Sequence, residues 1–346
     1  MATSVADRTA KDQLVALDPP QQAQFYPAKL RALTRDHLGF ELEEVSGMPD
    51  GALGWSARAS AVVYLAETVV GRALGRTLVS AQDRGAEQIH VICADEAAMV
   101  ARRAATFKMP VDVWSIGTDG LAAAEPAPHA PSPVLPEATV ALTADIVAAG
   151  ADPVIEHGVL VGEVRGLEIV RAEDRNGVVE LGVGVGDFDR EVFGLIHGDV
   201  PTMEAVREVV ETVARHRCPG ADPHPLNRIV SERWLRSLLI DEPGRIGFST
   251  LASAEPPVAR VSVKETMPAI AVGELGGEEW VVAVSTGIDL DLVPYAADAR
   301  LKLAPDAPLA IVVPSRDAHR VTSRLAASLE IPARLIAIDD NWRSWS

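Results

Sequence analysis

Two segments of the chain share one pattern of apolar and polar positions. Ile89–Ile116 aligns without a gap with Ile311–Ile338, and identical pairs run from the first position to the last. Each segment opens with a short apolar run, typical of a buried parallel strand, continues with helical spacing and ends in another apolar run after a proline. A repeat of this length predicts a duplicated domain and not a short-period solenoid.

The residues before the first segment predict the rest of its module. Helical spacing over Phe25–His37 is followed by strand-like runs over Phe40–Val45 and Gly54–Tyr64, and Glu67–Arg84 is helical again. The predicted order is α-β-β-(β)-α-β-α-β. Alternating strands and helices predict a sheet that is at least partly parallel and covered by helices.

The second half repeats this order. A helix begins near Leu235–Leu238, a strand covers Trp280–Val284, and Asp289–Leu303 forms the next helix. The middle of the chain has no counterpart in the first module. Val159–Ala172 and Val178–Val185 alternate apolar and polar residues and predict a β-hairpin.

These patterns divide the chain into six parts, and a Pro/Ala-rich stretch marks the clearest linker. They are a flexible tail over 1–20, a first α/β module over 21–121, the linker over 122–136, a middle region of β-hairpin plus helix over 137–220, a second α/β module over 221–338, and a tail over 339–346 that we expect to pack on its own domain.

Composition narrows the classes of partner. The chain carries 49 acidic and 32 basic residues, a net charge of −17, which repels a phosphate backbone and argues against non-specific nucleic-acid binding. Two cysteines, Cys93 and Cys218, have no metal-ligand spacing. No secretory signal or apolar run of membrane-spanning length is present. We therefore expect a cytoplasmic, acidic protein that binds a protein partner or a second copy of itself and no membrane.

The element order of each module resembles the restriction-endonuclease-like fold of the PD-(D/E)xK nuclease superfamily, over roughly 24–117 and 231–338. The resemblance implies a metal-binding Asp on one strand and an acid-x-Lys on the next. Asp50 and Glu67 are the candidates in the first copy, and Asp289 with Glu274 or Glu265 upstream in the second.

The Lys of that motif is missing from both copies. We therefore expect no intact nuclease site. The sequence leaves the cofactor unknown, and a divalent metal is expected only if the protein is an atypical nuclease. The alternative interpretation of Glu67 and Asp289 is that they are acids at helix N-termini, favoured by the helix dipole.

Other polar residues are candidates for ligand binding. In the middle region these are His157, Glu163 and Arg165, for which a solvated hairpin face with ion pairs is the simpler interpretation. The segment Asp222–Arg236 adds His224, Asn227, Arg228 and Arg233 between prolines that restrict its backbone. We expect this segment to pack on the hairpin and to bring arginines next to its acids.

The segment His224–Arg236 also resembles an HPLNR-x-x-x-ERWLR pattern of an uncharacterised actinobacterial family, which implies no activity. The predicted fold is α/β, a duplicated restriction-endonuclease-like module with a β-hairpin-rich middle region. The first functional hypothesis is a non-catalytic nuclease-like scaffold or interaction protein. The alternatives are a small-molecule-binding protein or enzyme with a site between the hairpin and the HPLNR segment, and an atypical metal-dependent nuclease.

Overall fold

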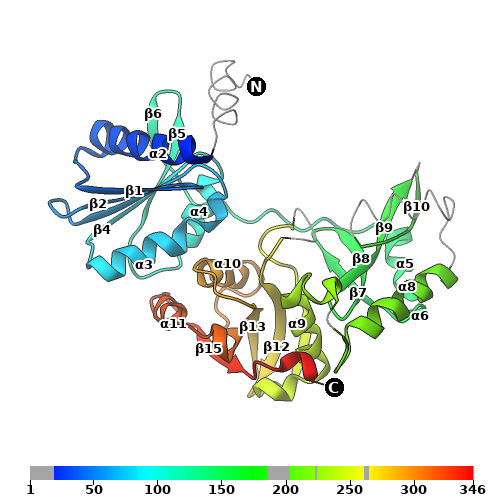
Figure 1. The fold of residues 1–346 in the computed structure, drawn as a ribbon. Coiled ribbons are helices and arrows are strands. Elements are labelled where there is room, and N and C mark those ends of the chain that lie inside the picture. Colours follow the sequence, from blue (N-terminus) through cyan, green and yellow to red (C-terminus); the bar gives the residue numbers. More distant parts are fainter. Residues whose placement is uncertain (1–18, 176, 186–202, 223, 261–264, 346) are drawn as a thin grey trace. The chain divides into compact units, whose positions relative to one another are not determined.

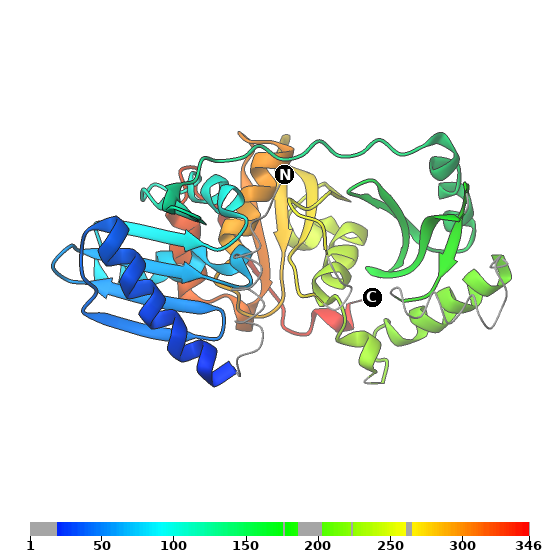
Figure 2. The same ribbon diagram turned by 90° about the horizontal axis from the view of Figure 1, so that it is seen from above.

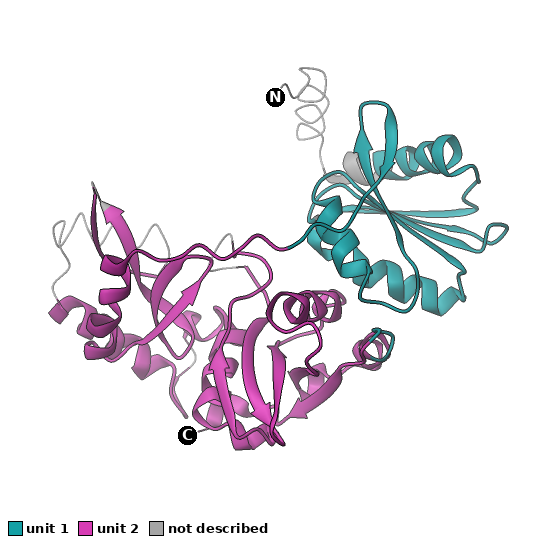
Figure 3. Ribbon diagram, turned by 180° about the vertical axis from the view of Figure 1, so that it is seen from behind, with its two compact units in different colours: residues 1–128, 327–330 teal, residues 129–326, 331–346 magenta. Residues whose placement is uncertain are grey.

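The chain forms two compact units, residues 1–128 with 327–330 and residues 129–326 with 331–346 (Figure 3). The structure is a computed structural model that describes residues 19–175, 177–185, 203–222, 224–260 and 265–345. The predicted tail over 1–20 lies outside the described residues except for Pro19 and Pro20, with which the first described helix begins.

The first unit is a six-stranded sheet in the order β1-β2-β3-β4-β5-β6 (Figure 1). Strands β1 to β3 are antiparallel neighbours, β4 and β5 run parallel to β3, and β6 turns back along β5. The elements are α2 Pro19–Leu33, β1 Glu44–Met48, β2 Gly51–Ser56, β3 Ala61–Ala66, α3 Leu74–Arg84, β4 Gln88–Cys93, α4 Ala97–Ala104, β5 Asp112–Gly117 and β6 Gly120–Ala123.

Alternation along β3 explains why helices cover both faces of this sheet. Val63 and Leu65 pack with Tyr26 and Leu30 of α2 on one face, and Figure 2 shows α2 lying across the strands. Tyr64 points to the other face, where its hydroxyl meets α3. Every residue of β3 is buried, which is typical of a strand between two helical layers.

The second unit begins with a four-stranded antiparallel meander, β10-β9-β8-β7, packed against helices. The apolar sides of its helices contribute Ile146, Val206 and Val213 to one core with the strands. The elements are α5 Glu137–Ala141, α6 Thr143–Ala148, β7 Asp152–Glu156, β8 Val159–Val164, β9 Leu167–Arg175, β10 Val178–Val183 and α8 Met203–His216.

The prediction of one strand over Val159–Ala172 is wrong, because the chain turns in the middle of that run. Arg165 and Gly166 have φ of +47° and +76°, the backbone of a two-residue type I′ turn between β8 and β9. A Cβ on Gly166 would lie 2.3 Å from the carbonyl carbon of Arg233, so only glycine permits this close approach to the helix α9 Ser231–Asp241.

The same unit ends in a five-stranded sheet, β11-β12-β13-β14-β15. Helix α9 packs on one face of this sheet, where Trp234, Leu235, Leu238 and Leu239 form a hydrophobic core with residues of the strands. The elements are α9 Ser231–Asp241, β11 Thr250–Ser253, β12 Ala269–Leu275, β13 Glu278–Val284, α10 Leu292–Leu303, β14 Leu309–Pro314, α11 Arg320–Ala327 and β15 Arg334–Ile338.

The two larger sheets share strand order and direction. In both, two antiparallel pairings are followed by two parallel ones, β3-β4-β5 in the first and β13-β14-β15 in the second. The expected α/β class is confirmed, and the predicted run over Gly54–Tyr64 contains two strands joined by a turn. A common origin of the two modules stays a prediction.

The chain end packs into the second unit. Trp342 is fully buried, and its ring makes an edge contact with Trp234 of α9 at 5.5 Å between centroids. The expectation that the tail over 339–346 packs on its own domain is therefore confirmed for the described residues through 345. Among the helices of the described part of the chain, none has both the length and the apolarity of a membrane span.

Candidate functional site

Asp50 and Glu67 come together at one end of the first sheet. Gly51 opens β2 opposite Ala66 at the end of β3, so the flanking residues Asp50 and Glu67 are neighbours. The amide of Glu67 donates to the carbonyl oxygen of Asp50 at 3.0 Å. A Cβ on Gly51 would lie 1.8 Å from the carbonyl oxygen of Leu65, so this close strand pairing requires glycine.

Each of these carboxylates has a cationic partner from a helix. Lys29 Nζ of α2 lies 2.5 Å from Glu67 Oε1, and Arg76 Nη1 of α3 donates to both oxygens of Asp50 at 3.0 and 3.2 Å. Arg76 also reaches the hydroxyl of Tyr64. Burial raises the pKa of the Tyr26 phenol, and the nearby charges of Glu67 and Asp50 raise it further. The formal charges of the two ion pairs, Lys29 with Glu67 and Arg76 with Asp50, cancel.

The prediction that Glu67 is a helix N-terminal acid is wrong. Helix α3 begins at Leu74, after a 3₁₀ turn over Val70–Arg72, so Glu67 lies in the connection that follows β3. Asp289 is also outside its helix, since α10 begins at Leu292 and the Asp289 carboxylate accepts from the amide of Asp291. Glu67 is therefore not in the first turn of a helix, whereas the Asp289 carboxylate lies at the N-terminal end of α10, just before its first turn.

In the second module, the acids Glu274 and Asp289 lie at opposite ends of the strands. Glu274 is opposite Glu279 near the start of β13, and Asp289 follows the end of that strand. Val284 is five residue steps along the strand from Glu279, about 17 Å at the rise of an antiparallel strand. The two carboxylates therefore cannot share a metal ion.

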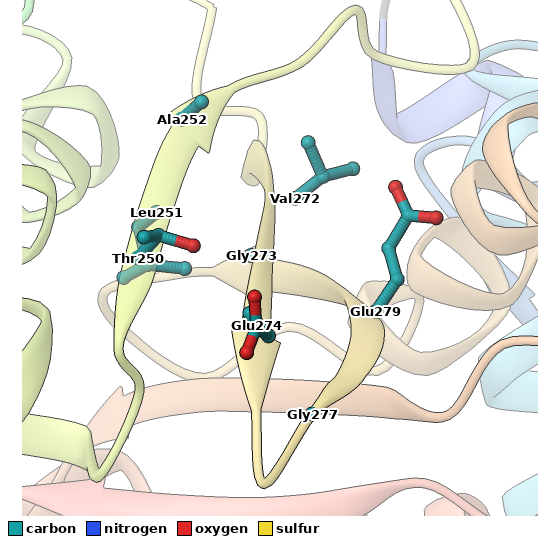
Figure 4. Close-up of a pocket in the computed structure, with 8 residues that line it drawn as sticks. All are labelled: Thr250, Leu251, Ala252, Val272, Gly273, Glu274, Gly277 and Glu279. Atoms are coloured by element: carbon teal, nitrogen blue, oxygen red, sulfur yellow. The ribbon is translucent and has the colours of Figure 1, made fainter.

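Glu274 instead lines an open cavity of about 420 Å³ on the β11-β12-β13 surface (Figure 4). Its strand neighbours are Thr250 on one side and Glu279 on the other. Like charges directly opposite each other on neighbouring strands are unfavourable. The cavity contains these two carboxylates and no basic side chain among its lining residues.

Strand register also corrects the alignment of the two candidate sites. Val62 pairs with Ile89, and Ala283 pairs with Ile311, so Ile288 and not Asp289 matches Glu67. The same counting through β2 and β12 matches Asp50 with Glu265. The predicted equivalence of Glu67 and Asp289 is therefore one residue out. No group of three or more His, Cys, Asp or Glu in the described part of the chain could hold a metal ion.

The predicted packing of the Asp222–Arg236 segment on the middle region is confirmed, through a buried ion cluster. Arg233 of α9 donates to Glu163 of β8 and to Glu156 of β7. Arg236, one turn later, lies 3.3 Å from an oxygen of each of the same carboxylates. We call Glu156, Glu163, Arg233 and Arg236 the interdomain ion cluster.

Neighbouring charges favour the ionised forms of Glu163 and Arg233 despite their burial. Burial acts to raise the pKa of the Glu163 carboxyl, but Arg233 and Arg236 outweigh it, and the pKa lies below its ordinary value. Burial acts to lower the pKa of the Arg233 guanidinium, but the charges of Glu163 and Glu156 outweigh this effect and raise the pKa above its ordinary value. Glu163 and Arg233 are thus structural partners of each other.

Arg165 and His157 occupy hairpin turns. Arg165 Nη1 donates to the carbonyl oxygen of Arg217 at 2.6 Å, and Arg217 Nη1 donates to the carbonyl oxygen of Arg165 at 2.7 Å. Arg217 also donates to the carbonyl oxygens of Leu226 and Ile229, and burial lowers its pKa to about 10.

His157, with φ of +51°, is in the turn between β7 and β8. Its amide donates to Glu255 Oε2 at 2.6 Å. Glu255 also accepts from Ser132 and Lys302. Neither Glu255 nor Lys302 carried a sequence signal, since each comes from outside the predicted motifs.

The remaining candidates of the HPLNR segment, His224, Asn227 and Arg228, each have different surroundings. The ring of His224 stacks on His216 at 3.8 Å, and its Nδ1 accepts from the amide of Leu226. Arg228 is exposed. Asn227 lines a cavity with the chain end. The described residues of this region thus make ion pairs and turns with one another, and a common ligand site between the hairpin and this segment stays a prediction.

Comparisons with known proteins identify no relative: no family model, no curated protein and no solved structure matches the chain.

The interdomain ion cluster predicts unequal effects of two arginine substitutions in one segment. We expect Arg233→Ala to lower the free energy of unfolding by about 3–5 kcal/mol, because it leaves buried carboxylates short of a partner. Arg228→Ala, at an exposed position, should change it by less than about 0.5 kcal/mol. Urea unfolding of both variants measures the difference, and equal effects would contradict the assignment.

The lowered pKa of Glu163 predicts an acid dependence of stability. A carboxyl whose pKa is lower in the folded than in the unfolded chain stabilises the fold above its unfolded value, ordinarily about 4.5. That contribution disappears as the pH falls through the folded pKa. Wild type should therefore lose stability more steeply below pH 4.5 than Glu163→Gln, which starts less stable. Parallel acid limbs in urea unfolding at stepped pH would refute this.

Proposed function

We propose that this chain is a non-catalytic binding protein on a nuclease-like scaffold, acting in the cytoplasm on a protein partner or a second copy of itself. The observation that carries the proposal is the pairing of Glu67 with Lys29 and of Asp50 with Arg76. The two acids are neighbours, which would suit a nuclease-like site, but each is paired with a cation from a helix.

Charge balance is the physical reason why we propose that Asp50 and Glu67 do not form a metal site. A divalent cation at two carboxylates gains its affinity from their uncompensated negative charge. Here the two partners already neutralise that charge, and the Glu67 carboxylate is 9% exposed. A metal ion would have to displace both cations. The net charge of −17 further disfavours a nucleic-acid ligand, and two free thiols, Cys93 and Cys218, suit a reducing compartment.

Removal of the two cations should create metal affinity where there was little. We expect the double variant Lys29→Met with Arg76→Met to bind Mn²⁺ at least tenfold more tightly than wild type, because two neighbouring carboxylates lose their counter-charges. Electron paramagnetic resonance of free Mn²⁺ measures this. Arg58→Met with Lys108→Met, at exposed positions of the same unit, removes the same charge and controls for net charge. Tight Mn²⁺ binding by wild type that Glu67→Gln abolishes would contradict the proposal.

One observation favours the atypical nuclease as a second candidate. The ammonium group of Lys29 lies next to Glu67 although it comes from α2 and not from the strand. A lysine at this place could orient an attacking water if a metal ion displaced the ion pairs.

Cleavage assays separate the two functions. Under the proposal, plasmid DNA and single-stranded RNA remain intact with Mg²⁺ or Mn²⁺. Cleavage that is lost in Lys29→Met and in Glu67→Gln, but kept in Lys108→Met, would establish the nuclease instead. A contaminating nuclease would be unaffected by all three substitutions.

A further inference from the structure

The open cavity on the β11-β12-β13 surface lies within one sheet of the second unit. Its volume of about 420 Å³ falls in the range of known ligand sites, about 300–1,000 Å³. The lining residues come from the three strands and from the turn between β12 and β13, and no helix contributes to the lining (Figure 4). We call the surface formed by Thr250, Ala252, Val272, Glu274 and Glu279 the sheet cavity.

Alternation along the strands gives the sheet cavity an apolar part and an acidic part. Leu251 belongs to the core under α9, so the neighbouring residue Ala252 points to the opposite face of the sheet. Ala252 pairs there with Val272, which is half-buried. Glu274 is two residues further along the same strand and lies directly opposite Glu279 on that face. The sheet cavity therefore presents an apolar surface with two carboxylates at one end.

The two carboxylates of the sheet cavity have no cation of their own. Both side chains are exposed, and neither makes an ion pair or a hydrogen bond within the described part of the chain. Like charges opposite each other on neighbouring strands repel, and a cation placed between them removes that repulsion. In the first unit, Asp50 and Glu67 each obtain such a cation from a helix. Glu274 and Glu279 instead present their charge to a partner.

We propose that the sheet cavity docks a basic segment of a protein partner, with an arginine side chain as its anchor. The guanidinium donates to Glu274 and Glu279, and the aliphatic stem of the arginine lies on Val272 and Ala252. The forked donors of arginine suit two carboxylates better than the compact ammonium of lysine does. Charge complementarity extends beyond the cavity, because the net charge of −17 attracts a basic partner and repels a second copy of the chain.

The open side of the sheet cavity favours a protein segment over a small cation. Sites for small molecules bury about 70–90% of the ligand surface, which requires walls around the ligand. Here the three strands form the floor, and a partner segment covers the open side with its own backbone and neighbouring side chains. The inference rests on the proposed function, since it names the chemistry of the protein partner. Its test addresses the second unit, whereas Mn²⁺ binding and cleavage report on Asp50 and Glu67, so either can fail alone.

The test measures fluorescence anisotropy of labelled ten-residue peptides with the full chain. One peptide alternates threonine with arginine, and the other alternates threonine with glutamine. We expect the arginine peptide to bind at least tenfold more tightly, and the double variant Glu274→Gln with Glu279→Gln to weaken its binding at least tenfold. This variant removes a repulsion, so its melting temperature should equal or exceed that of wild type. Lost binding then reports on the cavity and not on folding.

A second double variant controls for net charge. Glu278→Gln with Asp306→Asn removes the same charge from exposed positions outside the sheet cavity and should leave binding within twofold of wild type. Three results would overturn the proposal. The glutamine peptide binds as tightly as the arginine peptide, the two double variants lose binding equally, or the arginine peptide does not bind. Calorimetric binding of spermidine that only Glu274→Gln with Glu279→Gln abolishes, without peptide binding, would assign the cavity to a small polyamine instead.

Discussion

The interdomain ion cluster is the interaction on which the geometry of the second unit depends. Arg233 and Arg236 are three residues apart, so they lie on one face of α9, where both meet Glu156 and Glu163. Four charges leave water together, and each is tolerable only while its partners stay in place. The cluster therefore stabilises the arrangement of the four-stranded sheet against α9 less by its net energy than by the cost of any other arrangement.

The first unit also pairs its acids with cations, but within a single sheet and the helices that cover it. There the acids flank two neighbouring strands, and their cations come from the helices on either face, α2 and α3. In the five-stranded sheet the helix that corresponds to α2 is α9. Its arginines pair with acids of β7 and β8, which belong to the four-stranded sheet. Topologically matching helices thus carry positive charge to different acids, which explains how sheets of one strand order can have unlike polar ends.

Periodicity predicted the strands and helices well where burial is complete or nearly so, as in β14 and β4, because a strand between two helical layers is apolar over most of its length. It failed at the turns. His157-Gly158 and Arg165-Gly166 each form a two-residue turn with positive φ at both positions, and an X-Gly pair between alternating runs is the available signal. Without it, two turn residues were predicted as ligand-binding side chains.

The candidate sites were less predictable because their partners come from distant elements. Asp50 and Glu67 could be placed together from strand order, but no pattern along the chain links either to Lys29 or Arg76. Likewise Asn227 was selected for its unusual segment, whereas Arg343 and Asp340 line the same cavity only because Trp342 anchors the chain end in the core. Such juxtapositions depend on tertiary packing and leave no spacing to detect.

The double role of α9 bears on how the protein could have been assembled by gene rearrangement. Val230, just before this helix, belongs to the core of the four-stranded sheet, and Trp234 one turn later belongs to the core of the five-stranded sheet. A fragment transferred with its boundary near residue 221 would carry two buried guanidinium groups without their carboxylates. The middle region and the second sheet would therefore have to be transferred together for these charges to keep their partners.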